Sequence, residues 1–565
     1  MPATLESFLH EPRIAYFSME IAVRAEIPTY SGGLGVLAGD TMRAAADLCM
    51  PMVGVTLASR GGYLSQAIVD GRQLEAPDWW HPEQWAEPLP LKVCVPVEGR
   101  EVWIRAWLHR IEGTTGGVVP VLMLDTDVPE NAADDRAITH FLYGGDADYR
   151  LKQEIVLGIG GARMLAGLGF QVRKYHLNEG HAALLTLELV RRASHAPPAH
   201  GALAPRDAIA AVRERCVFTT HTPIEAGHDQ FGYELVDRVL GHFTDAAQLR
   251  ALGGGERLNL TRLALNLSDY VNGVAQRHAE VSRRLFPGYQ VHAITNGVHS
   301  WTWTGDAFRA LYDRHFAGWN REPAMLMRGD VLPDDEVWGA HVAAKRVLVA
   351  QVQASSGVWL DPEIPIIGFA RRMTAYKRPD LLFTDLARLA EIGRRTPFQI
   401  VLAGKAHPRD AGGKVIIERI HAWARELHGI VTIAFLPGYG MELARTLVAG
   451  ADVWLNTPLR PLEASGTSGM KAACNGVPQL SVLDGWWLEG WIEGVTGWAI
   501  GDESDADAGR DAASLYDKLS RTVLPLYHGD RRGWIAVMKG AISRNAAYFN
   551  SHRMLSRYAS EAYLA

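Results

Sequence analysis

Short apolar runs rich in Val, Ile and Phe recur along the first half of the chain, and each run ends in polar residues. They are RIAYFS to Ser18, MVGVTLA around Val55, VVPVLMLD around Leu122, KYHLNE around Leu177 and CVFTTH around Phe218. Uninterrupted apolar runs of this length are typical of parallel strands that are buried on both faces of a sheet. Between the first two runs, Leu34, Leu37 and Leu48 recur at helical spacing and predict an amphipathic helix.

A second and more regular series of such runs follows Asn296. The predicted strands are PIIGFA to Ala370, FQIVLAG to Gly404, and then GIVTIAFL, ADVWLN and PQLSVLD. The segment RPDLLFTDLARLAEIG, residues 378–393, predicts a helix with Pro379 in its first turn. Strands and helices that alternate in this way indicate a parallel, doubly wound sheet.

Two such units in one chain predict an α/β protein with two Rossmann-like domains that face each other across a central cleft. The predicted domains span residues 1–296 and 297–524, and residues 525–565 are expected to form helices that pack back on the first domain. Residues 191–207 and 502–511 are rich in Ala and Pro or in acidic side chains, and they are predicted to be solvated connections. Ligands of open α/β sheets bind beyond the carboxyl ends of the strands, so polar residues there are candidates for chemistry.

Composition and charge exclude several classes of function. The 565 residues are 48% hydrophobic and 21% charged, with a formal net charge of -6 and a pI near 6.4. The chain lacks the excess of basic residues that would indicate a nucleic-acid partner. A small substrate or a neutral polymer fits this composition better. The N-terminus has no signal-peptide pattern and no apolar run reaches the length of a membrane span, which predicts a cytoplasmic protein without a membrane partner. Four scattered cysteines without a C-x-x-C pair predict buried thiols in a reducing compartment, and no metal site is predicted.

Seventeen tryptophans are a high count, and several cluster among polar residues in DWWHPEQW (residues 78–85) and DGWWLEGW (residues 484–491). Indole rings offer sugars a flat apolar face beside a polar edge. Packing in the core or between domains is the simpler interpretation for most of them.

The segment EASGTSGMK, residues 463–471, follows the predicted strand ADVWLN. Glycines and hydroxyl residues at the start of a helix offer backbone N–H groups and hydroxyls that bind phosphate. The candidates for such an anion cradle are Thr467 and the N–H groups of Gly466, Ser468 and Gly469. For a Gly-rich loop alone, a tight turn that caps a helix is the simpler interpretation.

Lys471, which ends this segment, strengthens the case for a ligand. A partly desolvated lysine amine forms Schiff bases with carbonyl cofactors, and a phosphate cradle just upstream would anchor the other end of such a cofactor. Pyridoxal 5'-phosphate carries both an aldehyde and a phosphate. The residues therefore favour this cofactor.

The longer stretch EASGTSGMKAACNGVPQLSVLDG resembles the pyridoxal-phosphate signature of the α-glucan phosphorylases, which form glycosyltransferase family 35 and act on glycogen, starch or maltodextrin. The resemblance implies a GT-B fold and an imine between Lys471 and pyridoxal 5'-phosphate. It also implies that Thr467 and the N–H groups of Ser468 and Gly469 bind the cofactor phosphate. Tyr439, in FLPGYGMELA, would lie beside the cofactor, although core packing explains an aromatic residue there nearly as well.

The same resemblance assigns residues to the glucosyl unit. Glu463 and the backbone of Ser465 and Gly466 would bind its hydroxyls. In TNGVH, Asn296 would contact the 6-hydroxyl. His181, in HLNEGHAAL, would lie against the sugar and His221, in THTPIEAGH, nearby, although a lone histidine is more often a satisfied structural group.

The segment ARRMTAYKR resembles the part of the family that supplies an arginine and a lysine to the substrate phosphate. These residues would be Arg372 and Lys377, and Arg371 would face the cofactor. Several permanent cations are needed where two phosphate dianions lie side by side, although a charge run alone is more often a solvated surface. The chain departs from the large phosphorylases here, because Arg371 replaces a lysine and Thr374 and Ala375 replace a His-Glu pair.

In the first half, YSGGLGVLAGD resembles the glycine-rich helix start of the family. Gly32 and Gly33 would direct N–H groups and the positive helix end at the reacting phosphate. Ser31 stands in place of an asparagine. Motifs in matching order span Tyr16 to Asp484, which is most of the chain.

The resemblance implies phosphorolysis of the terminal bond of an α-1,4-glucan by orthophosphate, with retention, to give α-D-glucose 1-phosphate and a shortened glucan. A glucosyltransferase of the glycogen-synthase type is the first alternative, but such enzymes typically carry glutamate where Lys471 stands. A non-catalytic glucan-binding protein is the second, and its site would be expected to have lost Lys471 or the cations. The preferred glucan, the direction in the cell and allosteric control stay open.

The N-terminus reaches the first predicted strand almost at once, so no N-terminal regulatory arm is expected. The chain is therefore similar to the compact bacterial and archaeal type of the family. The resemblance favours a homodimer, although no stretch of the sequence indicates an interface.

Overall fold

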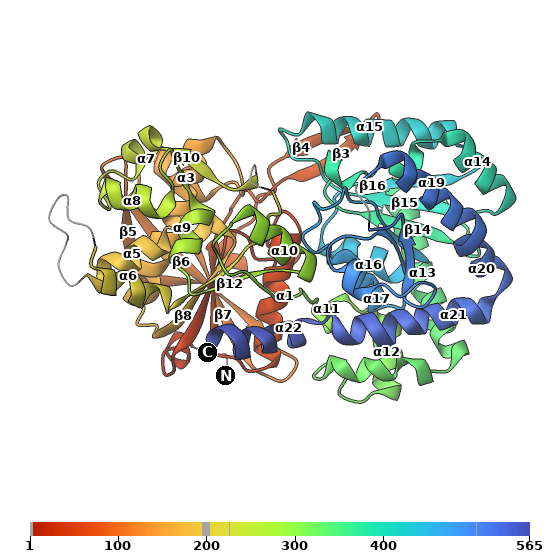
Figure 1. Cartoon of the computed structure of the whole chain (residues 1–565), viewed down its shortest axis with the longest axis horizontal. Helices are drawn as coiled ribbons and strands as arrows, with labels where there is room; N and C mark the ends of the chain where they lie inside the picture. The colour runs from red at the N-terminus through yellow and green to blue at the C-terminus, as the bar shows by residue number, and fades with distance from the viewer. Residues whose placement is uncertain (1–3, 195–203, 225–226, 504–505, 565) are drawn as a thin grey trace.

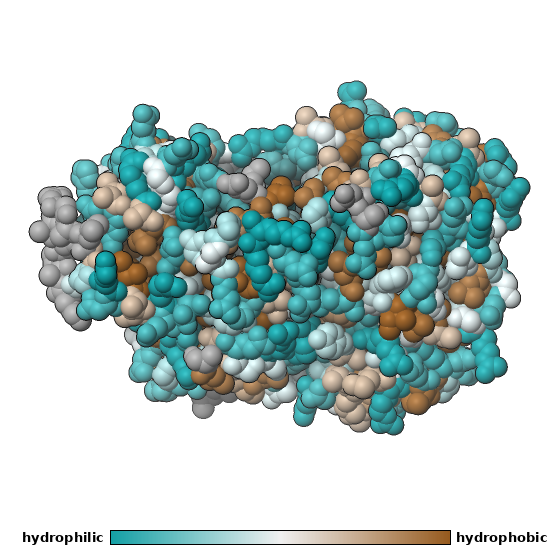
Figure 2. Space-filling view, in the orientation of Figure 1, coloured by the Kyte–Doolittle hydropathy of each residue, from teal (hydrophilic) through white to brown (hydrophobic). Residues whose placement is uncertain are grey.

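The computed structural model describes residues 4–194, 204–224, 227–503 and 506–564. The chain forms two α/β halves that lie side by side (Figure 1). No helix within these ranges is long and apolar enough to cross a lipid bilayer. The face seen in Figure 2 is mostly hydrophilic, with apolar side chains in small groups.

A nine-stranded sheet forms the centre of the first half. Its strands are β1 (Arg13–Ser18), β2 (Met52–Leu57), β5 (Glu87–Val97), β6 (Arg100–Glu112), β7 (Val118–Asp125), β8 (Val172–Asn178), β9 (Cys216–Thr219), β12 (Tyr270–Gly273) and β13 (His292–Ala293). Their order is β13-β12-β9-β8-β1-β2-β7-β6-β5, parallel from β13 to β7 and antiparallel from β7 to β5. The parallel part was predicted, whereas the antiparallel edge was not.

Both faces of this sheet are covered, which explains the unbroken apolar runs. In β1, Ala15 and Phe17 belong to one hydrophobic core and Ile14 and Tyr16 to the core on the other face. Side chains of a strand alternate between the two faces, so each face must offer an apolar residue.

Ten helices among the described residues surround this sheet. They are α1 (Gly33–Asp47), α2 (Ala133–Arg136), α3 (Ala147–Ile155), α4 (Gly161–Gly167), α5 (Leu185–Ala193), α6 (Arg206–Arg213), α7 (Tyr233–Val239), α8 (Ala246–Gly253), α9 (Leu260–Asn266) and α10 (Gln276–Leu285). The predicted connection 191–207 is helical at both ends, in α5 and α6, and its middle lies outside the described residues. Helix α1 confirms the predicted helix, but it is buried on nearly all sides rather than along one face, and Leu48 follows its end and is 39% exposed.

The second half contains a six-stranded sheet that is parallel throughout. Its strands are β14 (Ile366–Ala370), β15 (Gln399–Ala403), β16 (Thr432–Leu436), β17 (Val453–Asn456), β18 (Gln479–Val482) and β19 (Gly497–Ile500). Their order, β16-β15-β14-β17-β18-β19, is that of a doubly wound sheet. The predicted α/β class with two such halves is confirmed and agrees with a GT-B fold.

The helices of the second half run to the C-terminus. They are α11 (Ser300–Trp303), α12 (Asp306–His315), α13 (Asp334–Ser356), α14 (Leu386–Arg395), α15 (Ala411–Glu426), α16 (Met441–Gly450), α17 (Ser468–Ala473), α18 (Trp487–Gly490), α19 (Ala508–Lys518), α20 (Leu524–Gly529), α21 (Arg531–Gly540) and α22 (Ser551–Tyr558). The predicted connection 502–511 therefore contains the start of α19, where Asp507 accepts a hydrogen bond from the N–H of Arg510.

The helix predicted over residues 378–393 was wrong at its start. Arg378 has a left-handed φ of 44°, a short 3-10 turn covers Leu381–Phe383, and α14 begins only at Leu386. The carboxylate of Asp385 caps α14 by accepting a hydrogen bond from the N–H of Arg388. Pro379 therefore lies in a turn rather than in the first turn of the helix.

The last helices divide between the two halves. Tyr527 and Trp534, in α20 and α21, belong to the core of the second half, whereas Met554, Leu555 and Tyr558, in α22, belong to the core beneath α1. The return to the first half therefore begins at α22 rather than at residue 525. Figure 1 shows α22 beside α1, close to the start of the chain.

A two-stranded hairpin, β3 (Ser65–Val69) and β4 (Arg72–Ala76), extends from the first half to the second. Gln66 and Gln73 are buried there and hydrogen-bond the backbone of Gly404 and Ala406, beyond the end of β15. A second small hairpin pairs β10 (Gln230–Gly232) with β11 (Arg257–Asn259). Neither hairpin was predicted.

Two predictions about side chains need correction. Cys216 and Cys474 are buried, but Cys49 is exposed and Cys94 partly exposed, because sequence spacing carries no information about depth. Trp486 and Trp487 belong to the core of the second half, while Trp79 is 54% exposed. Core packing thus accounts for the first two tryptophans.

Candidate active site

The N-terminus of α1 faces the second half of the molecule. The amides of Ser31 and Gly32 donate hydrogen bonds of 2.5 and 3.2 Å to Glu20, which follows β1 and also accepts from the hydroxyl of Tyr143. The amide of Gly33 donates to no residue in the described part of the chain. One N–H group of the predicted anion site is thus free, and that of Gly32 is held by a carboxylate.

Glycines in α1 allow the helix to lie very close to its surroundings. A Cβ on Gly39 would lie 2.1 Å from the carbonyl oxygen of Ala22, and one on Gly35 would lie 2.7 Å from Glu20. The segment after β1 therefore packs directly against the helix backbone. This contact fixes the position of the helix start.

The loop before α17 presents unpaired backbone donors. Within the described residues, neither the amides of Gly466 and Thr467 nor the hydroxyl of Thr467 form a hydrogen bond. Gly466 has a φ of 83°, a conformation that favours glycine. The hydroxyl of Ser468 accepts a hydrogen bond of 3.0 Å from the indole N–H of Trp454. Trp454 therefore holds the loop on one side, while its unpaired amides remain available to an anion.

Lys471 lies in α17 and is buried. Its Nζ is 4.0 Å from the centre of the Trp303 ring and has no hydrogen-bond partner among the described residues. Burial lowers the pKa of Lys471 to about 8, although the charge of Asp40 in α1 opposes this shift. A neutral amine is therefore accessible near physiological pH, which Schiff-base chemistry requires.

Glu463 joins two of the predicted cations in one cluster. Its carboxylate accepts a hydrogen bond of 2.5 Å from Arg371 and bonds of 2.8 Å from Nζ of Lys377 to both oxygens. Burial alone would raise the pKa of Glu463, but the charges of Arg371 and Lys377 lower it to about 2. Nε and Nη1 of Arg371 are buried without partners, so the cluster has donors to spare.

Arg372 lies apart from this cluster and points to the first half. Its Nη2 is 3.4 Å from the hydroxyl of Ser31, and a Cβ on Gly32 would lie 3.5 Å from the same atom. The side chain is exposed. The chain therefore places a permanent cation from the second half beside the free N–H of α1.

His181 and His221 both lie on the first half. Nε2 of His181 is 3.4 Å from Asp229, and burial lowers the pKa of His181 to about 4. His221 is 2.6 Å from the side chain of Asn178, and burial lowers its pKa to about 3. Both rings are therefore neutral at pH 7. No hydrogen bond or ion pair among the described residues joins either ring to the Glu463 cluster.

Several polar atoms of the predicted site are buried without a partner. They are Nδ1 of His181, Oδ1 of Asn296, Oγ of Ser465 and two nitrogens of Arg371. Buried polar groups in native proteins are nearly always paired, so a ligand is the natural partner for these atoms. Tyr439 hydrogen-bonds the carbonyl of Ala370 at 3.5 Å and is partly buried.

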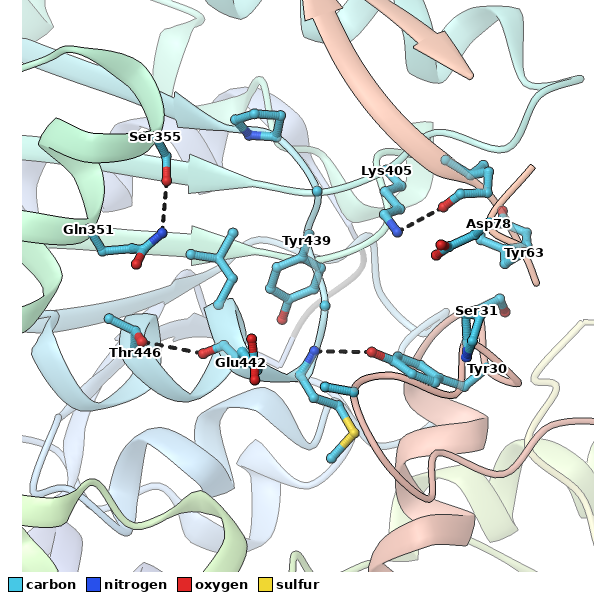
Figure 3. Close-up of a pocket in the computed structure, with 18 residues that line it drawn as sticks. Tyr30, Ser31, Tyr63, Asp78, Gln351, Ser355, Lys405, Tyr439, Glu442 and Thr446 are labelled. Atoms are coloured by element: carbon cyan, nitrogen blue, oxygen red, sulfur yellow. Dashed lines mark hydrogen bonds between the residues drawn. The ribbon is translucent and has the colours of Figure 1, made fainter. Parts of the chain in front are cut away.

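A pocket of about 530 Å³ opens beside this site, between the two halves. Figure 3 shows Tyr30 and Ser31 on one side of the pocket and Tyr439 and Glu442 on the other. The two sides are joined by a hydrogen bond that the amide of Met441 donates to the hydroxyl of Tyr30. Of the predicted site residues, Tyr439 alone lines it, and Ser31 borders it next to Gly32. The pocket is therefore not centred on residues 463–471.

Sequence reasoning missed four residues that hold this site. Glu20 binds the helix start, Trp303 covers Lys471, Asp229 orients His181, and Asp484 accepts the amide of Glu463 at 2.9 Å. Burial raises the pKa of Asp484 to about 6. Glu20 could have been found, because it follows the end of a predicted strand, but the others depend on the fold.

Comparison with known proteins agrees with these features. Residues 228–493 match the family model described as "Carbohydrate phosphorylase". The chain is 40% identical to "Maltodextrin phosphorylase" of Thermococcus litoralis, over 98% of this chain and 70% of that protein. It is 36% identical to "Glycogen phosphorylase" of Aquifex aeolicus, over 97% of this chain and 86% of that protein. It is 32% identical to an uncharacterized protein of Methanocaldococcus jannaschii, over 97% of this chain and 99% of that protein. The chain therefore belongs to the carbohydrate phosphorylase family.

Proposed function

We propose that the chain is an α-1,4-glucan phosphorylase that uses orthophosphate to release α-D-glucose 1-phosphate, with retention, from the end of a glucan. The observation that carries the proposal is the buried, unpaired amine of Lys471 directly after a loop with free backbone donors, in a member of this family. The relatives named for maltodextrin and glycogen support an α-glucan as the substrate.

The residues of the site fit pyridoxal 5'-phosphate. Lys471 supplies an amine of lowered pKa, and the amides of Gly466 and Thr467 supply unpaired donors for a phosphate. The spare nitrogens of Arg371 add positive charge nearby. When bound, the cofactor would supply a phosphate that exchanges a proton with the substrate phosphate.

The chain's own residues would bind and orient orthophosphate at the start of α1. The guanidinium of Arg372 lies beside Ser31 and Gly32, and the next residue, Gly33, has a free N–H, so both groups could contact an anion at this position. Both would stabilise negative charge as the glycosidic bond breaks, and their effect would grow once bound substrate excludes water from these exposed groups. Lys377 is held by Glu463, so a bound phosphate would compete with that carboxylate for the ammonium.

The glucosyl unit would meet neutral hydrogen-bonding groups. His181 is neutral at pH 7, and its unpaired Nδ1 is available to a sugar hydroxyl. Oδ1 of Asn296 and Oγ of Ser465 are available in the same way. Neutral donors and acceptors suit hydroxyl groups, and they leave the cations of the site to the phosphates.

The decisive variant is Lys471→Ala. We expect the purified unaltered protein to show a near-ultraviolet pyridoxal band and, after borohydride reduction, a cofactor adduct on Lys471. The variant should form at least about 10³-fold less glucose 1-phosphate from maltodextrin and phosphate, with an unchanged far-ultraviolet circular dichroism spectrum.

Lys414→Ala, which removes a surface lysine of α15, is the matched control and should keep both band and activity. Full activity without any adduct, or retained activity of Lys471→Ala, would contradict the proposal.

A cytoplasmic location and a homodimer complete the proposal. The four free thiols agree with a reducing compartment. The homodimer stays a prediction that light scattering can test.

A further inference from the structure

A buried cluster of three potential metal ligands lies outside the site described above. Asp47 at the end of α1, His299 just before α11 and His552 in α22 place a carboxylate oxygen and two ring nitrogens within 4.8 Å of one another. The side chains are 1%, 4% and 8% exposed, respectively. The helical rise places Asp47 about 20 Å from Gly33, so the cluster lies at the opposite end of α1 from the proposed phosphate position.

One histidine of the cluster has no hydrogen-bond partner. Nε2 of His299 lies 2.8 Å from Oδ2 of Asp47 and is hydrogen-bonded to it. Nε2 of His552 lies 3.2 Å from the same oxygen, yet both ring nitrogens of His552 are buried without a hydrogen bond. His552 thus contacts the carboxylate without good hydrogen-bond geometry, and a cation between the two groups would satisfy both.

The charge of Asp47 also lacks a permanent counterion. Among the basic side chains of the described residues, only the two histidines come within 4.0 Å of its oxygens, and no lysine or arginine does. The pair of His341 and Asp452 is equally buried at 2.7 Å, but there Nζ of Lys345 lies 2.8 Å from the carboxylate. At Asp47 the positive charge must come from a proton on a histidine or from a metal ion.

The groups around the cluster orient two of its members. Nδ1 of His299 lies 2.7 Å from the hydroxyl of Thr302, and Oδ1 of Asp47 accepts hydrogen bonds from the amide and hydroxyl of Thr114. Outer hydrogen bonds of this kind hold the ligands of metal sites in place. The C-terminal end of α1 also carries partial negative charge, which favours a cation there.

We propose that Asp47, His299 and His552 bind a divalent transition-metal ion, with Zn²⁺ the best match to two imidazoles and one carboxylate. Ligand atoms of a tetrahedral zinc site lie about 3.3 Å apart, and the two distances to Asp47 require only small adjustments. Three protein ligands leave the fourth position to water.

The ion would have a structural role. Its ligands come from α1, from the segment that joins the two halves, and from α22, which returns to the first half. The ion would therefore hold α22 against α1, the helix whose other end faces the proposed phosphate position.

The test uses the full chain after chelator treatment and dialysis. On titration with Zn²⁺ we expect one equivalent to bind per chain and the Tm to rise by about 3 °C or more. Co²⁺ in its place should give the visible absorption of a tetrahedral cobalt site. His552→Gln should abolish the stoichiometric binding, the cobalt band and the Tm shift, and His341→Gln, which removes an equally buried histidine, should keep all three.

Two results would overturn the proposal. The first is no uptake of Zn²⁺ by the unaltered chain, which would assign the charge on the cluster to a protonated histidine. The second is equal uptake by His552→Gln, which would place the ion elsewhere. If His552→Gln does not fold, the cobalt spectrum of the unaltered protein decides, because the absence of a tetrahedral band would reject the site.

Discussion

At the scale of single residues, the site depends on how burial and charge act on Lys471 and Glu463. Both are buried ionisable groups, but their surroundings differ. Glu463 has Arg371 and Lys377 against it and stays ionised, whereas Nζ of Lys471 lies over the Trp303 ring and, within the described ranges, has no hydrogen-bond or ion-pair partner, so it loses its proton more easily. Burial disfavours a charged group unless an opposite charge compensates it.

The lowered pKa of Lys471 predicts how cofactor capture depends on pH. Below about pH 8 the amine is mostly an ammonium, and above this pH it is mostly neutral. Capture of pyridoxal phosphate by the apoprotein should therefore become about fivefold faster from pH 7 to pH 8 and level off near pH 9. Stopped-flow absorbance of the pyridoxal band measures this rate.

An unshifted lysine would behave differently, since its neutral fraction grows about tenfold with each pH unit up to pH 10. A rate that keeps rising in this way through pH 9 and beyond would contradict the lowered pKa. Lys471→Arg, which retains a cation but no titratable amine, should show no capture at any of these pH values.

At the scale of elements, α1 connects the phosphate end of the active site to the core. Its N-terminal N–H groups face the second half, while Gly39 packs against the backbone of Ala22. The position of the helix start therefore depends on a close contact two turns away. The short loop before α17 depends on glycine in a similar way, because a Cβ on Gly469 would overlap the side chain of Gln479.

Gly39→Ala should displace α1. A Cβ would lie 2.1 Å from a carbonyl oxygen, so the helix must move, and we expect a loss of about 1–3 kcal/mol in unfolding free energy. The KM for phosphate should also rise several-fold, because Gly33 moves with the helix. Denaturant unfolding and initial-rate kinetics measure the two effects.

The matched control is Gly339→Ala in α13, where an added Cβ has open space. This change should stabilise the protein by about 0.5–1 kcal/mol and leave KM unchanged, because alanine favours the helix. Equal effects of the two substitutions would refute the close-packing explanation.

At the scale of the whole molecule, two segments of the described chain reach between the halves in addition to the segment that joins them. The β3–β4 hairpin carries Gln66 and Gln73 to the loops that follow β15 and β16, and α22 returns the end of the chain to α1. These crossings hold the start of α1, where we propose that orthophosphate binds, opposite Arg372. The cleft is therefore maintained by contacts outside the predicted motifs.

Gln73→Ala should weaken the contact between the halves. Its side chain hydrogen-bonds both the N–H and the C=O of Ala406, so truncation leaves two buried backbone groups unpaired. We expect a loss of about 1–3 kcal/mol and a calorimetric transition that broadens or separates into two. Gln353→Ala, an exposed position of α13, should leave the transition unchanged. A single, unshifted transition in Gln73→Ala would contradict this role of the hairpin.

The local features of this protein could be predicted from the order of its residues alone. Apolar runs bounded by polar residues located the parallel strands, because strands buried on both faces need apolar side chains on each. The loop before Lys471, residues 463–471, and the glycine-rich start of α1 could also be recognised in the sequence, because the groups of each lie within a few consecutive residues. The start of α14 was missed because Asp385 outweighs Pro379 as a helix signal.

The tertiary structure decided which distant residues meet. Glu463 with Lys377, Lys471 with Trp303, and Asp47 with His299 are pairs far apart along the chain, the last separated by 252 positions. No spacing rule predicts such contacts. The antiparallel edge of the first sheet and the hairpin between the halves do not follow from local pattern either. The pKa values of the site depend on the same contacts, because burial and opposing charge exist only once the two halves have come together.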